Sequence, residues 1–294
     1  MEGRQFPRYL MILLKMNNRD RKPFKNYINQ GQFPVRAKKS LGQHFLKDQS
    51  VAQKIVAALC EDGSEANVIE IGPGTGVFTQ YLIQRPQLNL KVVEIDKEAV
   101  GYLLEAYPQI SKNLYEADFL KLDLENIFPK DFVVIGNLPY NISSQIFFKI
   151  LDYRNQIPEV VCMIQKEVAE RLAAPSGTKT YGILSVLLQA WYNIEYLFTV
   201  GEGAFVPPPK VKSAVIRLRR NERMELGCDE VLFKKIVKTS FNQRRKTIHN
   251  SLKPIWNDLP CIGRGTQNID IPFLDKRPEQ LSVEEFVALT TSLS

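Results

Sequence analysis

The most chemically specific residues of this chain form one short loop, Asn137-Leu138-Pro139-Tyr140. A side-chain amide, a proline carbonyl and an aromatic ring in this order suit an amine carried by a planar base. Such an amine is a poor nucleophile because its lone pair is delocalised into the ring, and two acceptors on its N–H groups help to localise it. The Asn137 oxygen and the Pro139 carbonyl can accept these bonds, while Tyr140 offers a face on which an unstacked base can lie. The alternative is a proline turn with a core tyrosine.

A second aromatic residue, Phe205, precedes the stiff run Pro207-Pro208-Pro209. Because proline restricts the backbone, this loop can hold the ring against the other face of the target base. The local sequence is almost as typical of a phenylalanine buried beside an edge hairpin. We predict Phe205 as a catalytic residue together with Asn137, Pro139 and Tyr140.

Three further candidates follow the ends of successive predicted strands. The turn over residues 70–76 has Gly-x-Gly-x-Gly spacing, and Val77 stands where the dinucleotide fingerprint needs its third glycine. The turn therefore suits a nucleoside without a pyrophosphate. Glu94 ends the next strand and can accept from two ribose hydroxyls, and Asp118, followed by Phe119, can accept from an adenine amine. Each feature alone is typical of an ordinary turn or an exposed cap, but the three in order predict a nucleoside cofactor.

The elements that position these loops alternate between short apolar strands and helices over about 170 residues, which predicts an α/β fold with a doubly wound parallel sheet. The predicted strands cover residues 67–71, 90–95, 113–116, 132–135, 160–164, 192–200 and 213–219. The predicted helices among them begin after the N-cap Asp48 and cover 77–84, 97–107, 143–151, 166–173 and 182–190. The last two strands have no helix between them, so we expect them to form an antiparallel hairpin at one edge.

After Arg220 the pattern changes to helices separated by glycine and proline, predicted over residues 230–241, 245–252 and 283–293. We therefore predict three parts. Residues 1–37 form a basic arm, residues 38–220 form a catalytic domain with the nucleoside cofactor, and residues 221–294 form a small all-helical domain.

The formal net charge of +7 is unevenly distributed over the 294 residues. Residues 1–40 hold ten basic against two acidic residues, residues 41–209 thirteen against twenty, and residues 210–253 thirteen against four. Basic flanks around an acidic body predict a polyanionic partner, because Lys and Arg neutralise phosphates. Charge alone does not separate nucleic acid from an anionic membrane, and a solvated helix face is the alternative.

Several classes of protein are disfavoured. Four cysteines without a Cys-x-x-Cys pair argue against a zinc ribbon or a disulfide framework, and they suggest reduced thiols in the cytoplasm. With only two histidines, a histidine-rich metal site is excluded, and we predict no metal. No apolar run reaches the ~20 residues that span a bilayer, so we expect neither membrane insertion nor secretion.

Seven stretches follow one another along the chain in a recognisable order. They cover residues 42–46, 70–76, 137–143, 165–168, 181–185, 205–211 and 241–246. In this order they resemble the family of rRNA adenine dimethyltransferases, and the resemblance extends over residues 38–294.

This resemblance implies a class I methyltransferase fold of Rossmann type that uses S-adenosyl-L-methionine. The implied reaction is dimethylation of N6 on two adjacent adenosines near the 3′ end of 16S rRNA in the small ribosomal subunit, with a second role as a ribosome-biogenesis checkpoint. Apart from the resemblance, we expect a cytoplasmic protein and favour a monomer. By motif position, the implied cofactor-binding residues are His44, Leu46, Gly72, Glu94, Asp118 and Asn137. Many family members carry Asn where this chain has His44. We assign contact with the RNA backbone to Lys234, Lys235, Lys238, Arg244, Arg245 and Lys246.

Four rival interpretations remain. A ribosome-assembly factor that only binds the subunit has no need of the intact loop over residues 137–140. A resistance-type methyltransferase of large-subunit RNA is disfavoured by residues 205–210 and 242–246, and DNA adenine methyltransferases usually carry Pro where Leu138 stands. A dehydrogenase is disfavoured by the missing third glycine.

Overall fold

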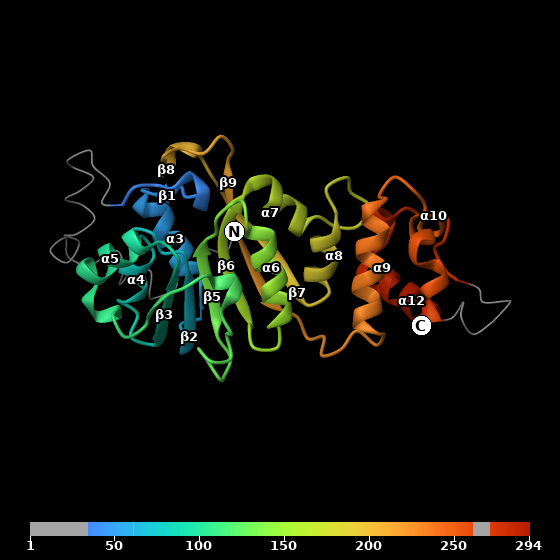
Figure 1. Cartoon of the computed structure of the whole chain (residues 1–294), viewed down its shortest axis with the longest axis horizontal. Helices are drawn as coiled ribbons and strands as arrows, with labels where there is room; N and C mark the ends of the chain where they lie inside the picture. Colours follow the sequence, from blue (N-terminus) through green and yellow to red (C-terminus); the bar gives the residue numbers. More distant parts are fainter. Residues whose placement is uncertain (1–34, 61, 261–270) are drawn as a thin grey trace, which may run out of the picture. The chain divides into compact units, whose positions relative to one another are not determined.

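The computed structural model describes residues 35–60, 62–260 and 271–294 (Figure 1). The predicted arm over residues 1–37 lies outside the described residues except for its last three. Among the described residues, no helix combines the length and the apolar character that crossing a bilayer requires. The three cysteines of the described part, Cys60, Cys162 and Cys228, are free thiols.

A seven-stranded sheet carries the loops that hold the candidate residues. Its strands are β2 (Ala66–Ile71), β3 (Leu88–Glu94), β4 (Leu114–Glu116), β5 (Val133–Asn137), β6 (Glu159–Gln165), β7 (Tyr192–Val200) and β9 (Ser213–Arg220). Their order is β4-β3-β2-β5-β6-β9-β7. The first five are parallel, and β9 runs antiparallel to β6. The doubly wound sheet is confirmed, and β7 and β9 are neighbours at its edge as predicted.

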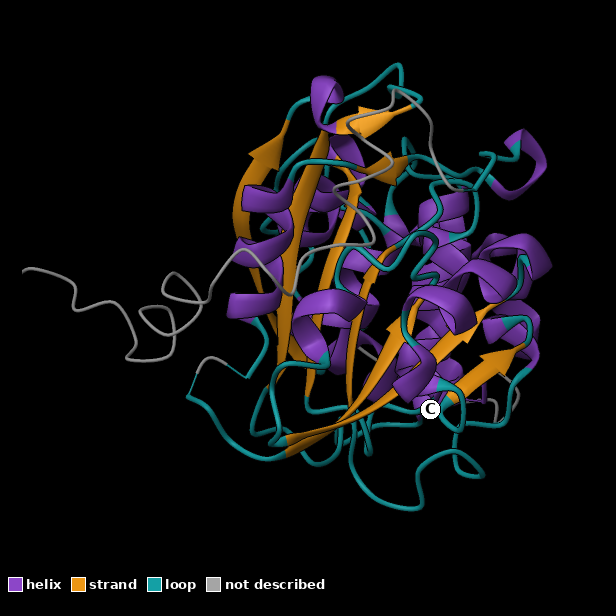
Figure 2. Ribbon diagram, turned by 90° about the vertical axis from the view of Figure 1, so that its left-hand side faces the viewer, coloured by secondary structure: helices purple, strands orange, loops and turns teal. Residues whose placement is uncertain are grey.

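The sheet is covered on both faces, as Figure 2 shows with helices on either side of the strands. Val68 and Ile135 belong to a core that includes residues of the helices on one side. The alternate residues Ile69 and Val134, which point to the opposite face, are also fully buried. This burial on both faces explains why the sequences of the strands are continuous apolar runs and do not alternate between apolar and polar residues.

The helices agree with the predicted pattern at most ends. In chain order they are α3 (Gln49–Ala58), α4 (Thr79–Leu82), α5 (Lys97–Ala106), α6 (Ser143–Asp152), α7 (Lys166–Ala173), α8 (Ile183–Gln189), α9 (Glu230–Asn242), α10 (Ile248–Leu252) and α12 (Val283–Leu293). Asp48, Asp96 and Asp229 accept hydrogen bonds from the first backbone N–H groups of α3, α5 and α9.

Two predicted helices are shorter in the structure. Helix α4 keeps only four residues of the predicted 77–84, because the chain enters it through a turn that holds Gly76 at φ 75°. Helix α10 begins at Ile248 rather than at residue 245, since residues 243–246 form a turn after α9. Arg245 and Lys246 therefore lie in a turn and not on a helix.

A second, two-stranded sheet was not predicted. β1 (Phe45–Leu46) pairs antiparallel with β8 (Phe205–Val206), with Phe45 opposite Val206 and Leu46 opposite Phe205. This pairing joins two motifs that lie about 160 residues apart in the chain.

The chain divides into two compact units. One contains Met1–Lys166 and Tyr196–Arg219, and the other contains Glu167–Glu195 and Arg220–Ser294. The second unit thus takes in Glu167–Glu195, which the prediction placed in the domain over residues 38–220. The physical reason is that α8 packs against α9 and α12, so it shares the core of the C-terminal helices.

Candidate functional site

A cavity of about 230 Å³ opens at the carboxyl ends of the parallel strands, within the first unit. Its walls come from the ends of β2, β3 and β5, from residues 117–120 after β4, and from residues 40–45. The strand order reverses at β2, between β3 and β5. In open α/β sheets, ligands bind at such a switch point. The cavity is lined by seven of the predicted site residues, namely His44, Gly72, Glu94, Asp118, Asn137, Pro139 and Tyr140.

The glycine turn after β2 is shaped by a close contact at Gly74. This residue has φ 57°, and a Cβ atom built on it would lie 2.8 Å from Cε1 of Phe45. A larger residue would therefore be strained by both its backbone and its neighbour. Phe45 and Gly74 together close one side of the cavity.

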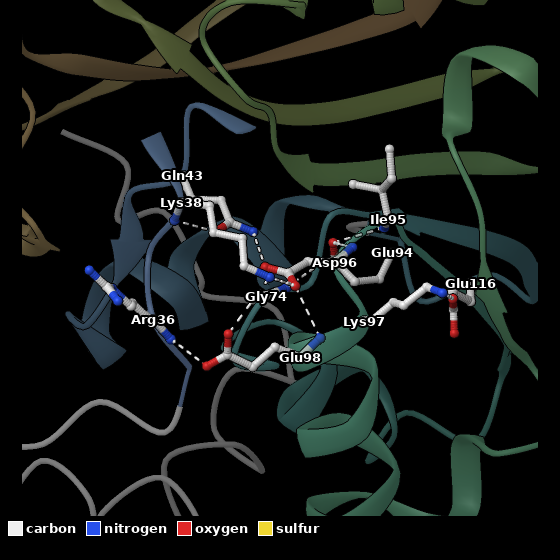
Figure 3. A network of polar contacts seen from close by, with 10 residues as sticks. All are labelled: Arg36, Lys38, Gln43, Gly74, Glu94, Ile95, Asp96, Lys97, Glu98 and Glu116. Atoms are coloured by element: carbon white, nitrogen blue, oxygen red, sulfur yellow. Dashed lines mark hydrogen bonds and ion pairs between the residues drawn. The ribbon is translucent and has the colours of Figure 1, made fainter. Parts of the chain in front are cut away.

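Glu94 connects this turn to the end of β3. One carboxylate oxygen accepts from Gly74 N at 3.0 Å, and the other accepts from the N–H groups of Ile95 and Asp96, each at 2.9 Å (Figure 3). Burial raises the pKa of Glu94, while these backbone donors act in the opposite direction. The predicted ribose ligand would add its hydroxyls to an acceptor that the backbone already orients.

Asp118 and Phe119 form the wall after β4. Asp118 accepts from Leu120 N at 3.0 Å, and its carboxylate lies 3.9 Å from Lys121. Lys149 of α6 donates to the carbonyls of Leu120 and Leu122 and lies 5.4 Å from the centre of the Phe119 ring. Burial lowers the pKa of Lys149. This lysine, which the sequence did not single out, fixes the loop predicted to receive an adenine.

Asn137, the last residue of β5, is oriented by a single hydrogen bond. Its Nδ2 donates to the backbone carbonyl of His44 at 2.9 Å. Because a carbonyl can only accept, the amide nitrogen must face His44, and Oδ1 is the acceptor that remains. Pro139 and Tyr140 line the same cavity, and the Tyr140 hydroxyl bonds to Ser213 Oγ. Burial raises the pKa of Tyr140.

Two predicted site residues do not reach the cavity. Phe205 and Leu46 are each 1% exposed, and they belong to the same hydrophobic core. In this structure Phe205 pairs with Leu46 across the β1–β8 sheet and its side chain lies in the core, as the alternative interpretation of a phenylalanine buried beside an edge strand has it. Stacking of the Phe205 ring on the target base stays a prediction. Leu46 likewise contributes its side chain to the core and not to the cavity wall.

A polar network that sequence reasoning missed holds residues 36–43 against the start of α5 (Figure 3). Lys38 forms an ion pair with Asp96, and Gln43 Nε2 donates to the same carboxylate at 3.1 Å. Arg36 N donates to Glu98 at 3.0 Å. Burial alone would raise the pKa of Asp96, but the bonds from Lys38 and Gln43 lower it. Only the Gly-Gln pair within the motif over residues 42–46 hinted at this network.

Glu70 belongs to the glycine motif but lies beneath the cavity. It is 1% exposed, and the Thr79 hydroxyl donates to one of its oxygens at 2.6 Å. Burial raises the pKa of Glu70 to about 8. Its role is therefore to anchor α4 to β2.

The basic residues predicted to contact RNA lie in the second unit. On α9, the buried residues include Phe233 and Ile236, and the lysines at 234, 235 and 238 lie on the more exposed side. Lys235 lies 3.6 Å from Asp258, and Arg244 lies 3.8 Å from Glu279. Arg245 and Lys246 are exposed in the turn that follows.

Comparison with known proteins gives consistent matches. The family model described as ribosomal RNA adenine dimethylase matches residues 35–258. The chain is 59% identical to the "Ribosomal RNA small subunit methyltransferase A" of Parabacteroides distasonis, over 87% of this chain and 93% of the relative. It is 58% identical to the protein of the same name from Bacteroides thetaiotaomicron, over 88% and 94%.

Two solved structures share the fold. A dimethyladenosine transferase from Plasmodium falciparum superposes with a TM-score of 0.69 at 26% identity, covering 84% of this chain and 96% of the other. The 23S rRNA methyltransferase ErmE gives a TM-score of 0.58 at 24% identity, with coverage of 85% and 99%.

Proposed function

The chain belongs to the ribosomal RNA adenine dimethylase family, and from this premise we propose that its substrate is 16S rRNA in the small ribosomal subunit. The reaction is methyl transfer from S-adenosyl-L-methionine to the N6 atoms of adenosine, and the proposed targets are two adjacent adenosines near the 3′ end. The proposed place of action is the cytoplasm. The observation that carries the proposal is the Asn137 amide, whose orientation leaves one acceptor for the substrate beside Pro139 and Tyr140.

The residues of the cavity fit the cofactor. Glu94 presents a buried carboxylate at the end of β3, and Asp118 presents a partly exposed one after β4. Gly74, which packs against the Phe45 ring without a Cβ, lines the same cavity. These groups match the ribose hydroxyls and the adenine amine of a nucleoside. When bound, S-adenosyl-L-methionine supplies a methyl group activated by its sulfonium.

The protein's part in the transfer is orientation of the substrate amine. Asn137 Oδ1 and the Pro139 carbonyl accept hydrogen bonds from the two N6–H groups, which localises the nitrogen lone pair and directs it. Tyr140 holds the base by stacking. No general base is needed, because the adenine N6 that has gained a methyl and still carries its two protons is strongly acidic and loses one of them to water. In the second transfer, N6 keeps one hydrogen, so one of the two acceptors becomes dispensable.

The second unit supplies the proposed contact with the rRNA backbone. Lys234, Lys235 and Lys238 on α9 and the exposed Arg245 and Lys246 after it offer positive charge to phosphates. Arg244 is held within the unit by Glu279 and by the carbonyl of Thr178. Its role in this proposal is therefore to fix the turn as well as to add charge.

The test is incubation with S-adenosyl-L-methionine carrying a labelled methyl group and small subunits from cells that lack adenine dimethylation. We expect label only in small-subunit RNA, at adjacent adenosines converted to N6,N6-dimethyladenosine. Label in large-subunit RNA or in naked DNA would contradict the proposed substrate. Tight subunit binding without transfer would favour the binding-only assembly factor instead.

A further inference from the structure

We propose that the His44 side chain positions Tyr140 for the target adenine and is not a ligand of the methyl donor. This inference rests on the proposed function and assigns a further residue to the same site. The resemblance to the family implied the opposite role, in which residue 44 binds the cofactor.

The backbone and the side chain of His44 contact different groups. Its carbonyl oxygen accepts from Asn137 Nδ2 at 2.9 Å, and any residue at this position could supply that oxygen. The imidazole is therefore free of this task, and its own contacts indicate what it does.

The imidazole contacts two groups of the protein. Its ring is stacked on the ring of Tyr140, with 5.5 Å between the ring centres and 26° between the planes. Its Nδ1 lies 2.8 Å from the backbone oxygen of Pro207. Since that oxygen can only accept, Nδ1 carries the proton. The ring is thus held at its edge by the proline loop and presents its face to Tyr140.

Tyr140 is consequently fixed in two ways. His44 covers one face of its ring, and the hydroxyl bonds to Ser213 Oγ. An aromatic ring has two faces, and Tyr140 lines the cavity, so the proposal assigns its second face to a planar base. The ring and the two acceptors, Asn137 Oδ1 and the Pro139 carbonyl, belong to the same four-residue loop. A change in the tilt of Tyr140 would therefore turn the N6 atom of a stacked base away from those acceptors.

The test compares His44→Ala, His44→Phe, Tyr140→Ala and the double variant His44→Ala/Tyr140→Ala. Phenylalanine is the matched control because it keeps a ring to stack on Tyr140 while losing Nδ1. Two quantities are measured, namely kcat with undermethylated small subunits and the Kd of S-adenosylhomocysteine by calorimetry.

For a positioning role we expect His44→Ala to lower kcat by about tenfold, as a small misplacement of substrate does. The Kd of S-adenosylhomocysteine should stay within about twofold, and His44→Phe should recover most of kcat. The double variant should be no slower than Tyr140→Ala, because His44 acts through that ring.

Three binding or kinetic results would overturn the proposal. They are a rise in Kd as large as the fall in kcat, full activity of His44→Ala, and additive losses in the double variant. A crystal structure of His44→Ala in which the Tyr140 ring keeps its orientation would overturn it whichever RNA is methylated. Failure of the unaltered enzyme to methylate small subunits would instead contradict the proposed function.

Discussion

Asn137 offers two hydrogen-bonding groups of opposite kind, and the fold uses one of them to aim the other. The bond from Nδ2 to the His44 carbonyl settles which end of the amide meets the substrate. Neither the loop sequence nor the strand pattern reveals this, because the partner lies 93 residues away in the chain.

Replacement of Asn137 by Ala should remove the acceptor for N6–H and the bond to His44 together. We expect kcat to fall by at least ~100-fold, comparable to the loss of one preorganised hydrogen-bonding group at a reacting centre. The rate of methyl transfer to small subunits measures it. The thermal unfolding midpoint serves as the control, since the fold should survive. Full activity of the variant would remove Asn137 from the mechanism.

A second residue, Glu70, makes the free energy of unfolding of this protein depend on pH. Its pKa in the folded protein is about 8, against an ordinary value of 4.5. The folded state therefore retains a proton that the unfolded chain loses. The stabilisation is complete below about pH 4.5 and is lost as the pH rises toward 8.

We expect Glu70→Gln, which does not titrate, to gain stability relative to the unaltered protein as the pH increases. The difference should grow by up to ~1.4 kcal/mol per pH unit between about pH 5.5 and 7.5. Urea unfolding of both proteins at several pH values measures it, with the exposed Glu65→Gln as the matched control. Parallel pH profiles for Glu70→Gln and the unaltered protein would contradict the assignment.

At the scale of elements, one wall of the cavity is a short segment that is held at both of its ends. Residues 40–45 line the cavity. The Lys38–Asp96 ion pair holds the beginning of this wall, and the β1–β8 pairing holds its end. Cofactor affinity should therefore depend on contacts that do not touch the cofactor.

Lys38→Met should weaken the binding of S-adenosylhomocysteine by about 5- to 30-fold, because residues 40–45 lose one of the contacts that order them. The physical reason is that the Asp96 side chain, which is 0% exposed, loses its cation while Gln43 alone remains. Calorimetry measures the Kd. The exposed neighbour Lys39→Met is the control and should bind normally. Equal Kd values for the two variants would show that the ion pair does not order the wall.

The strands from β2 to β6 were predicted closely, because each is a buried apolar run between clear turns. β1 and β8 were not, since two residues carry no periodicity. That omission is why the sequence did not place Phe205 beside Leu46 in the core. The Lys38–Asp96 pair joins residues 58 apart, and nothing local in the sequence marks it.

At the scale of the whole molecule, the chain places its cavity and the basic residues of α9 in separate units. The first unit holds the cavity, and α9 with the turn after it lies in the second unit. Methyl transfer and attachment to RNA should therefore be separable by mutation.

The triple variant Lys234→Glu/Lys235→Glu/Lys238→Glu should bind small subunits more weakly and show a shallower dependence of log K on log salt. The slope should decrease by about one for each phosphate that the variant no longer neutralises. Binding at several salt concentrations measures this, and the Kd of S-adenosylhomocysteine should not change.

The matched control is Lys112→Glu/Lys130→Glu. Both lysines are exposed and precede β4 and β5, at the edge of the sheet opposite the cavity. A salt slope that is the same for the triple variant and for the unaltered protein would remove α9 from the RNA interface.

The pairing of Phe45 with Val206 also has a consequence for the order of events during synthesis of this chain. The segment over residues 40–45 leaves the translating ribosome early, but its partner strand emerges about 160 residues later. At ~5–20 residues per second this delay lasts about 10–30 s. A nascent chain therefore binds the methyl donor only after β8 has emerged. C-terminal truncations that remove this strand should abolish that binding even when β2 to β5 are intact.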